Sequence, residues 1–219
     1  MSRSRGTPLV ISAPSGTGKT SVCRAVVERD PGVVFSTSHT TRAPRPGERD
    51  GIDYHFVTAE AFRALADEGA FLEYAEYSGN LYGTTVAAVE EQLSRGIDVL
   101  LEIETEGARQ VRARRSDAVL VFILPPSWAA LVQRLRGRGT DTAEEVDRRL
   151  AIARREFQAA RAFDYFVINE ALEAAIERMR ALLDRLREGD MAGLQRQFGR
   201  EAVAAELDAE LGAHLRDAG

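Results

Sequence analysis

Short apolar runs alternate with amphipathic stretches along most of this chain. Residues 9–11 read Leu-Val-Ile between Pro8 and a glycine-rich segment, which predicts a buried parallel strand. Valines at helical spacing then predict a helix over 20–29. The same order returns with expected strands at 98–103, 118–124 and 165–169 and expected helices at 107–115 and 127–136. This alternation is typical of an α/β fold whose parallel sheet carries helices on both faces.

Two segments interrupt the alternation. Residues 37–84 contain short β-like pieces, two prolines and several glycines, which indicate an inserted small α+β lobe. Residues 137–149 are polar and charged, with two glycines at one end, and we expect a mobile lid there. The core domain is then expected over 1–36, 85–136 and 150–187.

Helical spacing continues to the end of the chain. Apolar residues recur at helical intervals over 146–160 and 172–186, and we expect both stripes to face the core. A further stripe, weakened by three glycines, predicts a helical C-terminal extension over 188–219. This extension could pack on its own domain or on a second subunit, or part of it could be disordered, so a monomer and a homo-oligomer both stay open.

Composition narrows the class of protein. A chain of 219 residues with 44% apolar content is expected to form one soluble globular domain with a sizeable core. A net charge of −5 argues against nucleic acid or an acidic membrane as a partner. Residues 1–7 lead into no apolar stretch of signal-peptide length and no 18-residue apolar run occurs, so we expect a cytoplasmic protein.

Cysteine and histidine offer little chemistry. Cys23 is the single cysteine and cannot form an intrachain disulfide, so we expect a small buried packing residue. The three histidines, His39, His55 and His214, lack the spacing of metal ligands. We therefore expect no structural metal.

A glycine-rich loop follows the first expected strand. Its second half, Gly18-Lys19-Thr20, meets the phosphate-loop pattern, although Ala13 stands where that pattern has glycine. Lys19 is also the only lysine beside 28 arginines, and a compact ammonium suits a loop that wraps a polyphosphate better than a wider guanidinium does. Set between a strand and a helix, the loop predicts an ATP site formed by Ala13, Pro14, Ser15, Gly16, Thr17, Gly18, Lys19 and Thr20.

Further strings make a resemblance specific. Ser38-His39-Thr40-Thr41-Arg42-Ala43-Pro44-Arg45-Pro46-Gly47-Glu48 is followed by Gly51-Ile52-Asp53-Tyr54, then Glu73, then Gly79-Asn80-Leu81-Tyr82-Gly83-Thr84. Together with the phosphate loop, these strings resemble the guanylate kinase family, in order, from about residue 9 to about residue 186. The resemblance implies a P-loop NTPase-type core, a GMP-binding lobe over 37–84 and a lid.

The resemblance also implies roles in the lobe. Arg42, Arg45, Tyr54 and Tyr82 would hold the monophosphate of GMP, a dianion suited to guanidinium forks and phenolic donors. Glu73 would accept hydrogen bonds from the guanine N1–H and amino group, with Ser38 and Thr84 near the O6 and N7 edge. Adenine has no N1 proton and would leave that carboxylate unpaired, so GMP and dGMP are expected over AMP. The alternative to a guanine-binding role is that Glu73 is an exposed acid at a helix end, without a function in binding.

In the core and lid, the resemblance implies three catalytic arginines besides Lys19. Arg138 and Arg149 would close over the phosphates, with Arg134 supporting them from the preceding helix. The alternative is a solvated charge run. Asn169 matches a family position near the adenine of ATP.

One stretch departs from the family. The chain has Glu102-Ile103-Glu104 where Asp-Ile-Asp is usual, so each carboxylate is longer by one methylene. The resemblance implies that Thr20 and Glu102 hold Mg²⁺, partly through water, and that Glu104 touches guanine. The division of roles between the two glutamates stays open.

The expected reaction is direct transfer of the γ-phosphoryl group of Mg·ATP to GMP, giving ADP and GDP. A related small-molecule kinase, resembling ribose 1,5-bisphosphate phosphokinase, would share the loop but would not need Ser38, Glu73 and Thr84 together. A non-enzymatic guanylate-kinase-like binding module would keep the lobe but would have little use for Lys19 or the lid arginines.

Overall fold

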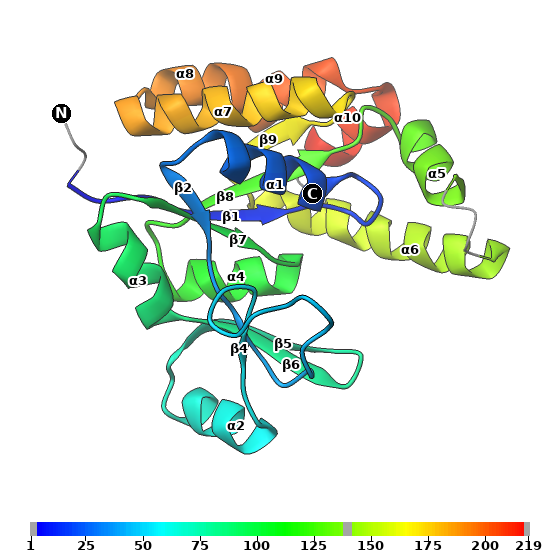
Figure 1. The fold of residues 1–219 in the computed structure, drawn as a ribbon. Helices are drawn as coiled ribbons and strands as arrows, with labels where there is room; N and C mark the ends of the chain where they lie inside the picture. The colour runs from blue at the N-terminus through cyan, green and yellow to red at the C-terminus, as the bar shows by residue number, and fades with distance from the viewer. Residues whose placement is uncertain (1–3, 138–141, 217–219) are drawn as a thin grey trace. The chain divides into compact units, whose positions relative to one another are not determined.

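A computed structural model describes residues 4–137 and 142–216 (Figure 1). A five-stranded sheet has the order β2-β7-β1-β8-β9. Its strands are β1 (Pro8–Ser12), β2 (Val33–Phe35), β7 (Asp98–Glu102), β8 (Val119–Leu124) and β9 (Tyr165–Ile168). β2 pairs with β7 and β8 with β9, both in parallel register. Every residue of β1 and β9 is buried, as a parallel sheet covered on both faces requires.

Helices flank this sheet, which confirms the predicted α/β class. Along the chain, the helices between and after these strands include α1 (Lys19–Arg29), α3 (Val86–Ser94), α4 (Thr105–Arg114), α5 (Trp128–Arg136), α6 (Ala143–Ala159) and α7 (Leu172–Glu188). A single 3₁₀ turn, η1 (Ala160–Ala162), follows α6. The expected strands and helices agree with these bounds to within two residues at each end, except that α6 begins at Ala143, three residues before the expected helical stripe over 146–160.

Contacts divide the chain into two compact units. Unit 1 comprises residues up to Leu9, Gly32–Leu101 and Glu106–Ala118, and unit 2 comprises Val10–Pro31, Glu102–Thr105 and the residues from Val119 onward. The division into a core, a lobe over 37–84 and a lid over 137–149 stays a prediction.

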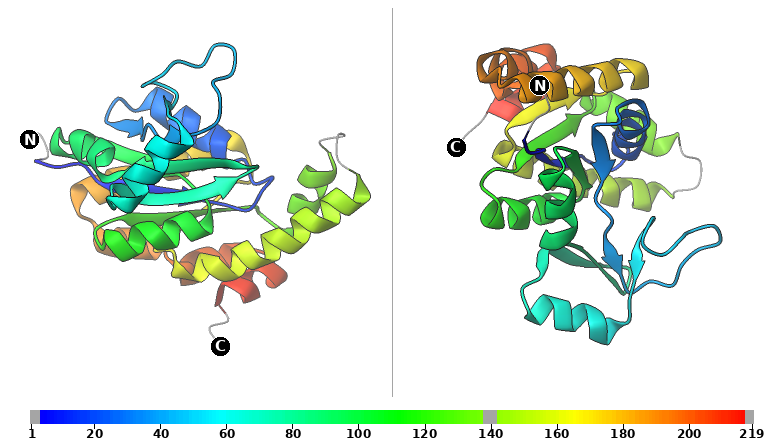
Figure 2. Two further views of the ribbon diagram at one scale, coloured as in Figure 1. Left: turned by 90° about the horizontal axis from the view of Figure 1, so that it is seen from below. Right: turned by 60° about the vertical axis from the view of Figure 1, so that its left-hand side comes forward.

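Unit 1 contains a second sheet of four strands in the order β4-β3-β6-β5 (Figure 2). Its elements are β3 (His39–Thr40), β4 (His55–Phe56), α2 (Ala59–Asp67), β5 (Phe71–Tyr77) and β6 (Asn80–Thr85). The hairpin β5–β6 is antiparallel, and β3 pairs antiparallel with β6. Phe62 of α2 stacks on Phe71 of β5 with ring centroids 4.4 Å apart, and both side chains are fully buried. An α+β arrangement therefore occupies the segment that broke the sequence pattern.

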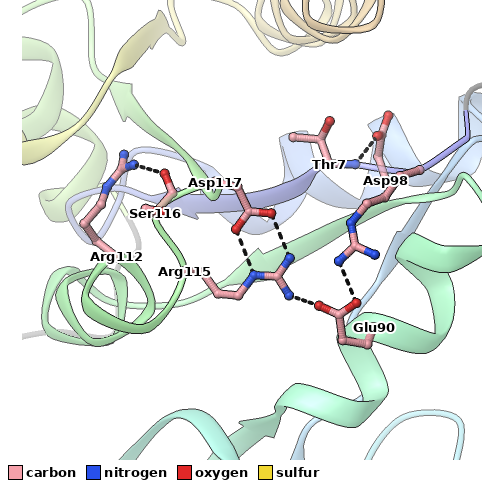
Figure 3. A network of polar contacts seen from close by, with 8 residues as sticks. Thr7, Glu90, Asp98, Arg112, Arg115, Ser116 and Asp117 are labelled. Atoms are coloured by element: carbon pink, nitrogen blue, oxygen red, sulfur yellow. Dashed lines mark hydrogen bonds and ion pairs between the residues drawn. The ribbon is translucent and has the colours of Figure 1, made fainter.

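Ion pairs fasten the N-terminal segment to the rest of unit 1 (Figure 3). Arg115 contacts Glu90 of α3 and lies 2.8 Å from Asp117. Arg5 lies 2.6 Å from Glu90. The buried carboxylate of Asp98 accepts the backbone N–H of Thr7 at 2.7 Å. Buried charges need partners of this kind, because unpaired burial is costly.

Unit 2 carries the helices on either side of β8 and β9. α1 packs beside α7, and Figure 1 shows α6 on the opposite side of these strands. Cys23 of α1 is buried, and desolvation raises the pKa of its thiol, so the predicted packing role is confirmed. Thr142 begins α6 with a capping box to Glu145. Residues 143–149 of the expected lid thus form the first two turns of α6, whereas Arg138 lies outside the described residues.

In the described part of the C-terminal extension, residues 188–216, the helices are α8 (Met191–Phe198), α9 (Arg200–Glu206) and α10 (Ala209–Arg216). Gly189 ends α7 in the left-handed conformation with φ 72°, and the chain turns back. Phe198 and Val203 are fully buried, and Arg178 of α7 pairs with Glu206 of α9 at 2.6 Å. The described part of the extension thus packs on its own unit, one of the three outcomes left open by the sequence. Over 4–137 and 142–216, no helix has both the length and the apolar character needed to cross a membrane.

Candidate functional site

The glycine-rich loop of unit 2 joins β1 to α1. Gly18 precedes the first helical residue with φ 89°, a conformation that glycine adopts without steric cost. Among the described side chains none caps this helix, so its first backbone N–H groups stay available. A helix N-terminus of this kind attracts anions through its N–H groups and its dipole.

Lys19 and Thr20 face the carboxyl end of β7. The Lys19 Nζ atom lies 3.2 Å from the carbonyl oxygen of Ile103 and 3.2 Å from Oε1 of Glu104. The Thr20 hydroxyl donates to Glu102. Loop and carboxylates line a cavity of about 360 Å³, formed by Ala13, Pro14, Ser15, Gly16, Gly18, Lys19, Thr20, Ser21, Glu102 and Glu104. Cationic, hydroxyl and carboxylate groups thus line one cavity, and this combination suits the phosphate groups of a nucleotide with its metal ion.

The oxygen donors here fit Mg²⁺. Thr20 and Glu102, the two residues expected to hold the ion, are in direct contact. In the described part of the chain, no group of three or more His, Cys, Asp or Glu side chains could hold a metal ion. Mg²⁺ commonly takes one or two protein oxygens and completes its shell with water and substrate phosphate, so this sparse set is sufficient.

Asn169 follows β9 and supports the loop from behind. Its side-chain amide is buried and donates to the carbonyl oxygen of Thr17 at 2.6 Å. Arg134 of α5 donates to the carbonyl oxygens of Asn169 and Glu170, each at 2.9 Å. Arg134 therefore contacts the backbone beside the loop. Arg149 lies half-buried on α6.

In unit 1, the structure brings together the three residues predicted to read a guanine edge. Glu73 of β5 is 5% exposed and lies opposite Thr84 of β6 in the hairpin register. The hydroxyl oxygens of Ser38 and Thr84 are 3.0 Å apart. Desolvation raises the pKa of Glu73, opposed by hydrogen bonds from Thr84. The alternative reading of Glu73 as an exposed acid at a helix end is wrong, because it lies buried in a strand.

Arg42, Tyr54 and Tyr82 form a second cluster in unit 1. The Arg42 guanidinium lies 5.5 Å from the centroid of the Tyr54 ring, and the two tyrosine rings are 6.2 Å apart. The hydrogen bond with Glu48 raises the pKa of Arg42, and Tyr82 makes a smaller contribution in the same direction. The side chain of Arg45 is exposed on the same loop. A guanidinium between phenol groups is a suitable binding site for a dianionic phosphate.

Comparison with known proteins decides the family. The family model described as guanylate kinase matches residues 5–186. The chain belongs to the guanylate kinase family. It is 51% identical over 178 residues to the guanylate kinase of Aromatoleum aromaticum, covering 81% of this chain and 87% of that protein. The guanylate kinase of Thiobacillus denitrificans is 45% identical over 200 residues, which cover 91% of this chain and 94% of that protein.

A solved structure agrees with the sequence comparison. The crystal structure of guanylate kinase from Anaplasma phagocytophilum superimposes with a TM-score of 0.62 at 34% identity, covering 84% of this chain and 87% of that one. Membership of the guanylate kinase family makes the protein a nucleoside monophosphate kinase, a phosphotransferase that uses ATP.

Two acids of this guanylate kinase were missed as site residues by the sequence reasoning. Glu156 of α6 lies beside Ser15, Lys19 and Glu104, and its Oε2 atom is buried without a hydrogen-bond partner among the described residues. Burial and the Glu104 carboxyl raise the pKa of Glu156 to about 7. The sequence did contain an indication of a special role for Glu156, because this acid falls within the apolar helical stripe that includes Ala153. The second acid, Glu48, contacts Arg42.

Proposed function

We propose that this guanylate kinase transfers the γ-phosphoryl group of ATP to GMP and dGMP. The observation that carries the choice of acceptor is the buried carboxylate of Glu73 beside the hydroxyls of Ser38 and Thr84. A carboxylate accepts from the N1–H and the amino group of guanine, whereas adenine offers it no N1 proton. A buried acceptor left without a donor is costly, so the pocket rejects AMP.

The phosphate groups have separate supports. Arg42, Arg45, Tyr54 and Tyr82 hold the acceptor phosphate, while the loop 13–20 holds ATP with Lys19 on the outer phosphates. Thr20 and Glu102 hold Mg²⁺, which neutralises charge on the phosphates when bound. Arg138 and Arg149 close over the transferred phosphoryl group. Arg134 and Asn169 support the phosphate loop, and Asn169 also lies near the adenine of ATP. Glu104 accepts a hydrogen bond from Lys19. We propose that it contacts guanine when GMP is bound.

The chemistry needs little beyond positioning. A phosphate oxygen of GMP is already anionic, so it attacks the γ-phosphorus in line without a strong general base. The protein supplies alignment, positive charge around the transferred group and exclusion of water. We further propose that the enzyme acts in the cytoplasm, as a monomer or a homo-oligomer, without nucleic acid or membrane partners.

A coupled assay of ADP formation tests the proposal. Mg·ATP is supplied with GMP, dGMP, AMP, CMP, UMP or ribose 1,5-bisphosphate in parallel, with Lys19→Ala as the control protein. Turnover confined to GMP and dGMP, and lowered by orders of magnitude in Lys19→Ala, is the expected result. Turnover with the sugar bisphosphate alone would indicate the related small-molecule kinase. Phosphopeptide binding without turnover would indicate a binding module.

A further inference from the structure

The carboxylate of Glu48 lies against the guanidinium of Arg42. The Nη2 atom of Arg42 donates to both carboxylate oxygens, at 2.9 and 3.0 Å. Both side chains are largely sheltered, 15% and 20% exposed. This contact differs from an exposed surface ion pair, which contributes little because solvent screens it.

Glu48 is itself fixed by the loop. Its Oε2 atom accepts the backbone N–H of Arg45 at 2.7 Å, and its own N–H donates to the carbonyl oxygen of Arg45 at 3.0 Å. Two prolines stiffen this turn, Pro44 and Pro46. The hydrogen bonds from Arg42 and Arg45 lower the pKa of Glu48, so it is charged at neutral pH. An anchored carboxylate of this kind can orient its partner.

Arg42 is held on its other sides as well. Its Nη1 atom donates to the carbonyl oxygen of Ala43 at 2.7 Å. The rings of Tyr54 and Phe56 lie with centroids 5.5 and 5.9 Å from the guanidinium carbon. A free arginine side chain loses considerable rotamer entropy when it binds a ligand, and these contacts remove that loss in advance.

We infer that Glu48 is a positioning residue, which holds the Arg42 guanidinium ready for the phosphate group of the acceptor nucleotide. This inference rests on the proposed GMP reaction and adds a determinant of affinity for the acceptor phosphate. Glu48 bears the same charge as the phosphate, so it acts through Arg42 and the loop backbone. A carboxylate that merely blocked the site would have the opposite effect on affinity.

Isosteric replacement separates positioning from blocking. Glu48→Gln keeps the shape of the side chain and removes its charge, so the charge-assisted contact with Arg42 weakens. The KM for GMP is expected to rise about tenfold, as for loss of a hydrogen bond to a charged group. The inhibition constant of guanosine, which lacks the phosphate, is expected to stay unchanged. Glu48→Asp retains the charge and should recover part of the affinity for GMP.

A matched control lies in the same loop. Asp53 accepts the backbone N–H of Arg49 at 2.7 Å, as Glu48 accepts that of Arg45, and among the described residues no hydrogen bond or ion pair joins Asp53 to Arg42. Asp53→Asn is therefore expected to affect GMP and guanosine equally. In the background of Arg42→Ala, the change Glu48→Gln should add no further loss of GMP affinity.

Three results would overturn the inference. These are tighter GMP binding by Glu48→Gln, an equal loss for GMP and guanosine, and a full additional loss in the Arg42→Ala background. Failure of the proposed function looks different, because the wild-type protein would then show no turnover with GMP at all.

Discussion

The side-chain amide of Asn169 donates a hydrogen bond to the carbonyl oxygen of Thr17 at 2.6 Å, joining the end of β9 to the phosphate loop. The two residues are 152 positions apart in the sequence. Because Asn169 is buried, water does not readily replace this bond. The position expected to lie near adenine thus also fixes the backbone of the loop.

Asn169→Ala is predicted to weaken both the fold and the loop. Loss of the donor leaves the buried Thr17 carbonyl unpaired, so the free energy of unfolding should fall by about 1–3 kcal/mol. The KM for ATP should rise as well, because the loop is less well positioned. Urea unfolding and steady-state kinetics measure the two effects. The control is Asn80→Ala, which removes an exposed bond to Ser78; an equal loss of stability in both variants would contradict the prediction.

Gly18→Ala is predicted to be destabilising for two separable reasons. Its φ of 89° costs an L-residue about 1–2 kcal/mol, and a Cβ atom there would lie 2.6 Å from Nδ2 of Asn169. Gly189 has a similar φ of 72° with no atom within 4 Å of such a Cβ, so Gly189→Ala carries only the first cost. Chemical denaturation of both variants should show a larger loss for Gly18→Ala. Equal losses would mean that the contact with Asn169 is readily relieved.

Local patterns in the sequence were sufficient for much of this fold. Buried strands such as β1 and β9 are continuous apolar runs, and amphipathic helices repeat at fixed spacing, so neighbours in sequence reveal them. The helical start at Ala143 was missed because the charged residues there resemble a loop, and the capping box of Thr142 and Glu145 was not used.

Contacts between residues far apart in the sequence could not be predicted from local patterns. The resemblance named Ser38, Glu73 and Thr84, but only the register of β5 against β6 reveals that Glu73 is buried opposite Thr84. Glu156 of α6 lies beside Ser15 and Lys19 of the phosphate loop, and nothing within the sequence of α6 alone specifies these partners. The position of Glu156 in an apolar stripe indicated that this acid is unusual, but it did not reveal which residues lie next to it.

Glu73→Gln is predicted to weaken the guanine preference. A neutral amide can donate as well as accept, so the pocket no longer demands the donors of guanine. The ratio of kcat/KM for GMP over AMP should fall at least about tenfold. Parallel kinetics with the two nucleotides measure this ratio, with Glu76→Gln on the exposed part of β5 as the control. Unchanged discrimination would remove Glu73 from guanine recognition.

The same substitution should change how stability depends on pH. Desolvation raises the pKa of Glu73, so the folded state favours its protonated form. The resulting stability is fully present below the unfolded pKa and is lost as pH rises through the raised folded pKa. Glu73→Gln has no charge to bury, so its melting temperature relative to the wild type should increase with pH across this range. A constant difference at every pH would contradict this assignment.

Glu156 is predicted to give a second loss of stability close to neutral pH. Burial and the Glu104 carboxyl raise its pKa to about 7, against the opposing effects of Lys19 and the Ser15 backbone. The wild-type protein should therefore lose stability as pH rises through about 7, because a buried carboxylate then becomes charged beside another.

Thermal unfolding between about pH 6 and pH 8 measures this loss in the nucleotide-free protein. Glu156→Gln should remove most of the decrease over this interval, because an amide has no proton to release. Glu144→Gln is the control, since Glu144 is an exposed acid in the first turn of the same helix, and it should keep the wild-type profile. A decrease that persists unchanged in Glu156→Gln would mean that another group titrates. Because Glu156 lies beside the phosphate loop, a decrease that is absent from Glu156→Gln would show that this loop adjoins a carboxyl group whose charge changes near physiological pH.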